Sequence, residues 1–220
     1  MNSRTPRVLV VGRSAQALTE TVSMLRARGI AANATNQYDR VLEDYDARDL
    51  DLVLFGGQVP AALREHLEAE LLRRHPHVRL RSGLGGLAPL LSAQVEELLG
   101  GPPSGVEHDA EARELRVTLA TPAHVTATAL WAVPVPPDPV PHAVALLDTT
   151  LQAGRHTIPV PPDVPAQGAF AAVRVGDRTT VVRLGPAPRP AARGTAPTPL
   201  PAPEPVATRL PWEEPAPRVP

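Results

Sequence analysis

Three short loops carry the residues of this chain that could bind an anion. They are "GRSAQ" (12–16), "GGQVP" (56–60) and "SGLGG" (82–86), and each lies between an apolar stretch and a helical pattern. Glycines allow a backbone to approach a ligand closely, and a helix beginning after each loop would direct main-chain N–H groups at an anion. The candidate nucleotide-binding residues are therefore Gly12, Arg13, Ser14, Gly56, Gly57, Ser82 and Gly83.

Tight strand-to-helix turns require the same glycines, and this is the interpretation that we favour. The loop at 12–16 departs from the G-x-G-x-x-G pattern, because Ser14 stands in place of the second glycine and its Cβ would crowd a pyrophosphate. The loop at 82–86 lacks an acidic partner for a ribose at the usual distance. A nucleotide- or dinucleotide-binding sensor or enzyme is thus the alternative hypothesis, and we expect no cofactor.

Composition excludes several other chemistries. There is no cysteine, and all 22 basic residues are arginine, so thiolate catalysis, Schiff-base lysines and P-loop lysines are ruled out. His75 and His77 flank a proline and the other histidines lie on separate predicted elements, so we expect no metal site. The paired Glu96 and Glu97 are expected on a solvated helix face. We identify no catalytic residues and expect a protein that is not an enzyme.

Charge and hydropathy limit the partners. The net charge is −1 with no basic cluster, whereas nucleic-acid binding depends on clustered cations. No apolar run approaches the roughly 18 residues of a membrane span, and the first apolar run is too short for a secretory signal. We expect a soluble cytoplasmic protein that binds neither nucleic acid nor membranes.

The first half of the chain alternates between strand and helix patterns. Predicted strands are 7–11, 30–34, 51–55 and 77–82, and predicted helices are about 15–28, 37–47, 60–74 and 86–99. This alternation is typical of a doubly wound parallel sheet with helices on both faces, here in the strand order 2-1-3-4.

The period changes after a glycine- and proline-rich linker. Six stretches of alternating polar and apolar residues follow, separated by turn residues, which indicates a small β-sandwich. The fold class is therefore α/β plus all-β. We divide the chain into an α/β domain (1–100), a linker (101–111), a β-sandwich (112–185) and a Pro-rich tail (186–220).

The tail has no apolar period and 12 prolines, so we expect it to be disordered. Within it "RLPWEEP" (209–215) places a tryptophan between a leucine and two acids. That is either a chance tryptophan or a motif that docks into a partner's groove. The candidate partner-binding residues are Leu210, Pro211, Trp212 and Glu213.

The strand ends "RVLVVG", "DLVLFGG" and "VRLRSG" resemble those of the receiver domain of bacterial response regulators, and the element order over 7–99 is similar. A receiver carries an acidic pair after its first strand, a phosphate-accepting aspartate after its third and a lysine after its fifth. Here Gly12 and Arg13 replace the acidic pair and Gly56 replaces the acceptor, while Ser82 fits the receiver's hydroxyl position. The resemblance implies a flavodoxin-like pseudo-receiver that cannot accept phosphate, because carboxylates must hold the metal and attack the phosphoryl group.

The second predicted domain looks like the immunoglobulin-like or fibronectin type III class. Residues 151–185, beginning "LQAGRHTIPV", resemble the C-terminal Ig-like modules of flagellar hook-capping proteins, which mostly space, cap or bind. Together the two resemblances imply a non-catalytic regulatory or scaffolding protein that acts through protein partners, including a second copy of itself.

Overall fold

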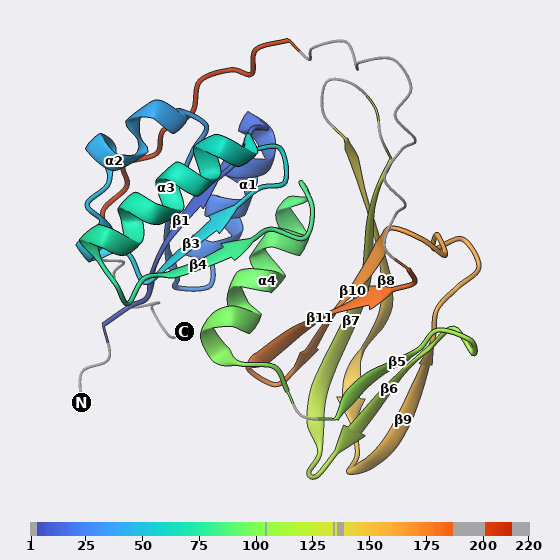
Figure 1. The fold of residues 1–220 in the computed structure, drawn as a ribbon. Helices are drawn as coiled ribbons and strands as arrows, with labels where there is room; N and C mark the ends of the chain where they lie inside the picture. The colour runs from blue at the N-terminus through green and yellow to red at the C-terminus, as the bar shows by residue number, and fades with distance from the viewer. Residues whose placement is uncertain (1–3, 104, 134, 136–138, 187–200, 213–220) are drawn as a thin grey trace. The chain divides into compact units, whose positions relative to one another are not determined.

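The computed structural model describes residues 4–103, 105–133, 135, 139–186 and 201–212 (Figure 1). The chain forms two compact units: residues 1–92 together with 202–220, and residues 93–201. The division falls inside a helix, α4 (Ala88–Gly100), and not at the predicted boundary after residue 100. The end of the predicted tail belongs with the first unit.

The first unit is built on a four-stranded parallel sheet. Its strands are β1 (Arg7–Val11), β2 (Ala31–Thr35), β3 (Leu52–Phe55) and β4 (Arg79–Ser82), in the order β2-β1-β3-β4. The predicted parallel sheet and its strand order are confirmed. The two central strands are almost wholly apolar because both of their faces are covered.

Helices cover the two faces of this sheet. Alternate side chains of β1 and β3 pack with α2 (Val41–Asp44) and α3 (Ala61–Arg74) in one cluster. The intervening side chains point to the opposite face, where α1 (Ala15–Arg26) lies (Figure 1). None of the helices in the described residues is long and apolar enough to cross a membrane.

The helix predicted over 37–47 is present only in part, because the helical path stops after Asp44. The chain instead forms the 3-10 turn η1 (Tyr38–Arg40), the single turn α2 and a second 3-10 turn, η2 (Ala47–Asp49). Tyr45 ends the helical path because its backbone is extended, with φ −131° and ψ 122°. The Asp46 side chain then accepts a hydrogen bond from Arg48 N and caps the next turn.

The second unit contains two antiparallel sheets around one apolar core. Sheet order is β11-β10-β7-β8 in one and β5-β6-β9 in the other. The strands are β5 (Val106–Asp109), β6 (Glu114–Leu119), β7 (Ala123–Val133), β8 (Val140–Leu151), β9 (Gly154–Pro159), β10 (Ala169–Val175) and β11 (Arg178–Leu184). All six predicted strands are present, whereas β5 lies in the predicted linker.

The last turns of α4 pack within this second unit through Glu96 and Glu97. Arg174 forms an ion pair with Glu96, whose carboxylate also accepts a hydrogen bond from Thr179 at 2.8 Å. Thr180 donates to Glu97 at 2.6 Å. The prediction of a solvated face is wrong for Glu96, because its side chain is only 10% exposed.

Candidate functional site

The glycines at the carboxyl ends of the strands pack against one another. Gly56 N donates to the Val11 carbonyl and Gly83 N to the Phe55 carbonyl, both at 2.7 Å. A Cβ on Gly56 would lie 3.3 Å from the Cα of Gly12, and one on Gly83 would lie 2.9 Å from Leu91 Cδ2. A Cβ on Gly83 would also lie 3.3 Å from the Phe55 carbonyl oxygen, so both positions leave little room for a side chain beside the backbone. Gly57 differs, since a Cβ there would meet nothing within 4 Å and its φ is not positive.

Arg13 and Ser14 lie at the point where the strand order reverses, between β1 and β3. Ser14 Oγ accepts a hydrogen bond from Ala17 N at 3.3 Å and so caps α1. The Arg13 carbonyl accepts from Asn36 Nδ2 at 3.3 Å. Ser82 ends β4, one strand farther along the same edge. Residues 12–14 and 56–57 thus adjoin in space, and the nucleotide hypothesis for them stays a prediction.

The described part of the predicted tail runs antiparallel along the outer edge of β2. Asn36 N donates to the Val206 carbonyl and Thr208 N to the Ala34 carbonyl, both at 2.9 Å. Thr35 and Ala207 form the corresponding antiparallel bridge. The expectation of disorder is therefore wrong for these residues, while 187–200 and 213–220 lie outside the described residues.

The register of residues 204–212 explains how so Pro-rich a stretch pairs with a strand. Main-chain groups of residues 204, 206, 208 and 210 bind the first unit. The prolines stand at 201, 203, 205 and 211. Since alternate residues of an edge strand direct their N–H and C=O groups at its neighbour, no proline falls where an N–H is needed. We call residues 204–212 the edge segment.

Two asparagines provide most of the side-chain contacts with the edge segment. Asn33 binds Leu210 at two points: its Nδ2 donates to the carbonyl at 3.1 Å, and its Oδ1 accepts from the N–H at 2.9 Å. Asn36 donates to the Glu204 carbonyl and accepts from Val206 N, both at 2.7 Å. Both asparagines are buried, with exposures of 1% and 6%. Their amide groups therefore satisfy a peptide backbone on an otherwise open sheet edge.

Thr208 lies at the centre of the contact. Its hydroxyl accepts a hydrogen bond from Ala34 N at 2.7 Å and donates to Asn33 Oδ1 at 3.0 Å. Its carbonyl accepts from the Tyr45 hydroxyl at 2.7 Å. Burial is the main cause that raises the pKa of Tyr45 to about 12, which keeps the phenol a neutral donor.

Charge and an aromatic side chain hold the far end of the segment. Arg209 Nη2 lies 2.5 Å from Asp44 Oδ1, and Arg40 binds the same carboxylate at 3.2 Å. The hydrogen bond from Arg209 is the main cause that lowers the pKa of Asp44, whose side chain is 5% exposed. Trp212 packs, partly buried, against the apolar cluster beside β1 and β3.

The four predicted partner-binding residues have different surroundings. Leu210 is 42% exposed and binds Asn33 through its main chain only. The Pro211 carbonyl accepts from Arg26 Nη2 at 2.7 Å. Glu213 lies outside the described residues. We call Asn33, Thr35, Asn36, Asp44 and Tyr45 the β2 groove. In the sequence its only sign is the polar "NATN" (33–36) at the end of a predicted strand.

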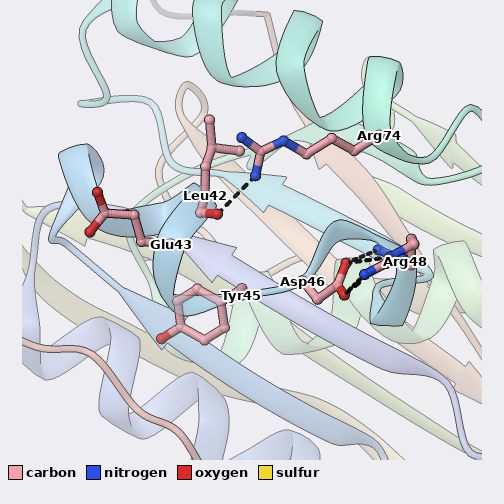
Figure 2. Close-up of a pocket in the computed structure, with 6 residues that line it drawn as sticks. All are labelled: Leu42, Glu43, Tyr45, Asp46, Arg48 and Arg74. Atoms are coloured by element: carbon pink, nitrogen blue, oxygen red, sulfur yellow. Dashed lines mark hydrogen bonds and ion pairs between the residues drawn. The ribbon is translucent and has the colours of Figure 1, made fainter.

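A hollow of about 480 Å³ lies beside the groove, between α2, η2 and the end of α3 (Figure 2). Arg74 donates to the Leu42 carbonyl at 2.8 Å, and Arg48 binds Asp46 at 2.7 Å. The hydrogen bonds from Arg48 lower the pKa of Asp46 to about 2. Both guanidinium groups thus already have partners. None of the described residues that line the hollow belongs to the strand-end loops, where ligands of such sheets usually bind.

The histidines remain dispersed. His124 Nε2 lies 3.0 Å from Asp148 Oδ1, and His156 Nε2 lies 2.8 Å from the Gln152 carbonyl. His75 and His77 meet edge to face with ring centres 6.1 Å apart. Across the part of the chain that the structure describes, no three His, Cys, Asp or Glu side chains are placed to hold a metal ion.

Comparisons with known proteins identify no family. No family model matches the chain, and no curated protein matches it. Among solved structures it is similar to the crystal structure of an NAD kinase from Archaeoglobus fulgidus in complex with ATP. That similarity has 13% identity and a TM-score of 0.27 over 81% of this chain and 84% of the other. At this level it carries no argument about fold or ligand.

Proposed function

We propose that this chain is a non-catalytic regulatory or scaffolding protein of the cytoplasm, acting through protein–protein interaction. The observation that carries the proposal is the β2 groove, whose buried asparagines bind the main chain of an extended peptide. Binding a peptide as an added strand on a sheet edge is a common mode of protein recognition. Here the chain's own edge segment is the bound peptide.

The first unit is proposed to be a pseudo-receiver. Its parallel sheet has the order β2-β1-β3-β4, and the strand ends carry Gly12, Arg13 and Gly56 where phosphotransfer needs carboxylates. Close packing of Gly56 against Gly12 supports a structural role for these glycines over a cradle for a nucleotide. The unit would then keep an interaction surface without a phosphorylation switch.

The second unit is proposed to be an Ig-like module of the fibronectin type III kind. Seven antiparallel strands in sheets of four and three, around a shared core, support this assignment. Such modules space or bind other proteins, which agrees with a scaffolding role.

A thermal-shift experiment separates this proposal from a nucleotide sensor. The full-length protein is heated with ATP, NAD⁺, a cyclic dinucleotide or acetyl phosphate, each in large excess. We expect no shift. A ligand at about 100 times its Kd would add about 2.7 kcal/mol, or several degrees. Such a shift, removed by Arg13→Ala, would contradict the proposal and make the strand-end loops a ligand site.

A further inference from the structure

The β2 groove recognises main-chain atoms that any extended peptide offers. Asn33 and Asn36 contact the backbone of residues 204, 206 and 210, and Thr35 Oγ1 donates to the Val206 carbonyl at 3.0 Å. None of these bonds depends on the side chain of the bound residue. The groove is therefore suited to an extended segment in general, and its selectivity must come from other contacts.

Three side chains of the edge segment supply that selectivity. The Thr208 hydroxyl fits between Ala34 N and Asn33 Oδ1. Arg209 neutralises the poorly exposed Asp44 carboxylate, and Trp212 reaches the apolar cluster. In chain order these contacts define a sequence pattern: a hydroxyl residue (208), a cationic residue (209), two further residues (210–211) and an aromatic residue (212). A peptide lacking the cation would leave a nearly buried carboxylate with fewer partners.

The edge segment is bound in a way that permits its removal. Apart from Val206, Thr208 and Trp212, its described residues are exposed. Its release would uncover polar groups of β2, which water or another peptide can satisfy, and the part of the apolar cluster that Trp212 covers. Seventeen residues, 187–203, separate it from Pro186 in the second unit.

We infer that the β2 groove is a binding site for an extended segment of another protein with this pattern, and that the edge segment is its resident competitor. The inference rests on the proposed function and names the partner chemistry of the same surface. A tethered segment acts at an effective concentration in the millimolar range. If the segment binds the open groove with a Kd of about 0.1 mM or tighter, an outside peptide must bind the wild-type chain at least about tenfold more weakly than a chain whose own segment has been released.

The test uses the full-length chain with Trp131→Phe, so that Trp212 is the single tryptophan. The release variant adds Thr208→Asp and Leu210→Pro, which remove the hydroxyl contacts and the N–H bound by Asn33. Ala202→Asp, at an exposed position before the edge segment, is the matched control. Acrylamide quenching of Trp212 reports release, and the anisotropy of a fluorescein-labelled peptide of residues 201–216 reports binding.

We expect the release variant to bind this peptide at least about tenfold more tightly than the wild-type and Ala202→Asp chains. Adding Asn33→Ala and Asn36→Ala to the release variant should abolish binding, and a scrambled peptide should not bind. Unchanged quenching in the release variant would overturn the inference, because these contacts would not hold the segment. Release of Trp212 without any binding of the peptide would also overturn the inference. The edge segment would then only stabilise the first unit, a role that we call a structural strap.

The outcomes separate this inference from the proposed function. A structural strap would remove the partner site at the β2 groove and leave the pseudo-receiver and Ig-like assignments standing. A nucleotide-induced thermal shift would contradict the non-catalytic role without changing the peptide result. A concentration-dependent dimer of the wild-type chain that Asn33→Ala abolishes would assign the groove to segments exchanged between copies. That result would overturn the resident-competitor role.

Discussion

Replacing Asn33 with alanine should release the edge segment while the rest of the first unit stays folded. The three hydrogen bonds described for this side chain all go to Thr208 and Leu210, at 2.9–3.1 Å. A hydrogen bond contributes about 1 kcal/mol net, so three contribute about 2–3 kcal/mol once the freed groups turn to water. Because about 1.4 kcal/mol is tenfold, the population of released segment should rise roughly 30- to 150-fold.

Limited trypsin digestion measures that population. Cleavage after Arg209 requires the segment to leave β2, and its rate follows the released fraction when release is fast relative to cleavage. Mass spectrometry should show faster cleavage after Arg209 in Asn33→Ala, with cleavage after Arg64 in α3 still slow. Gln16→Ala is the control, since its amide contacts Glu20 on the exposed face of α1. Equal rates after Arg209 in Asn33→Ala and wild type would refute the reasoning.

Three further predictions follow from the packing. Gly83→Ala should destabilise the first unit by about 1 kcal/mol, because its Cβ would lie 2.9 Å from Leu91 Cδ2 and 3.3 Å from the Phe55 carbonyl oxygen. Gly57→Ala should be neutral or slightly stabilising, and equal urea midpoints for the two variants would contradict this contrast. Tyr45 should ionise near pH 12 in an absorbance titration at 295 nm, with Tyr45→Phe as the reference. Because its pKa is raised on folding, its contribution to stability is fully present below pH 10 and is lost as the pH rises to about 12. Ionisation near pH 10 would contradict the burial of this side chain. Glu96→Gln should lower the free energy of unfolding of the second unit by about 1–3 kcal/mol, measured by urea denaturation, because the ion pair with Arg174 is lost. An unchanged urea midpoint would mean that the ion pair contributes nothing to stability.

Strands whose pattern is local could be predicted from the sequence. The apolar runs of β1 and β3 fix a buried parallel sheet, and the Leu and Val spacing of α1, α3 and α4 fixes three helices. The helix over 37–47 was predicted too long, because the chain becomes extended at Tyr45, whose hydroxyl donates to Thr208, 163 residues later. Helical periodicity cannot report such a contact.

The β2 groove could not be predicted for a different reason. Proline content indicates disorder only when no partner strand is available, and here the prolines fall at alternate positions that need no N–H. That register is defined only relative to Asn33 and Asn36, more than 160 residues earlier. Trp212 was identified as a candidate from its neighbours in the sequence, a leucine and two acids, but the surface that binds it was not.

Amide hydrogen exchange along the edge segment tests most directly whether it occupies β2. The N–H groups of Val206, Thr208 and Leu210 donate to the first unit, whereas the register directs those of Ala207 and Arg209 away from it. In the full-length protein, NMR should show slow exchange at 206, 208 and 210 and fast exchange at 207 and 209, and Asn33→Ala should remove the protection. Uniformly fast exchange from 204 to 212 in the wild-type protein would contradict the β2 groove and everything proposed from it.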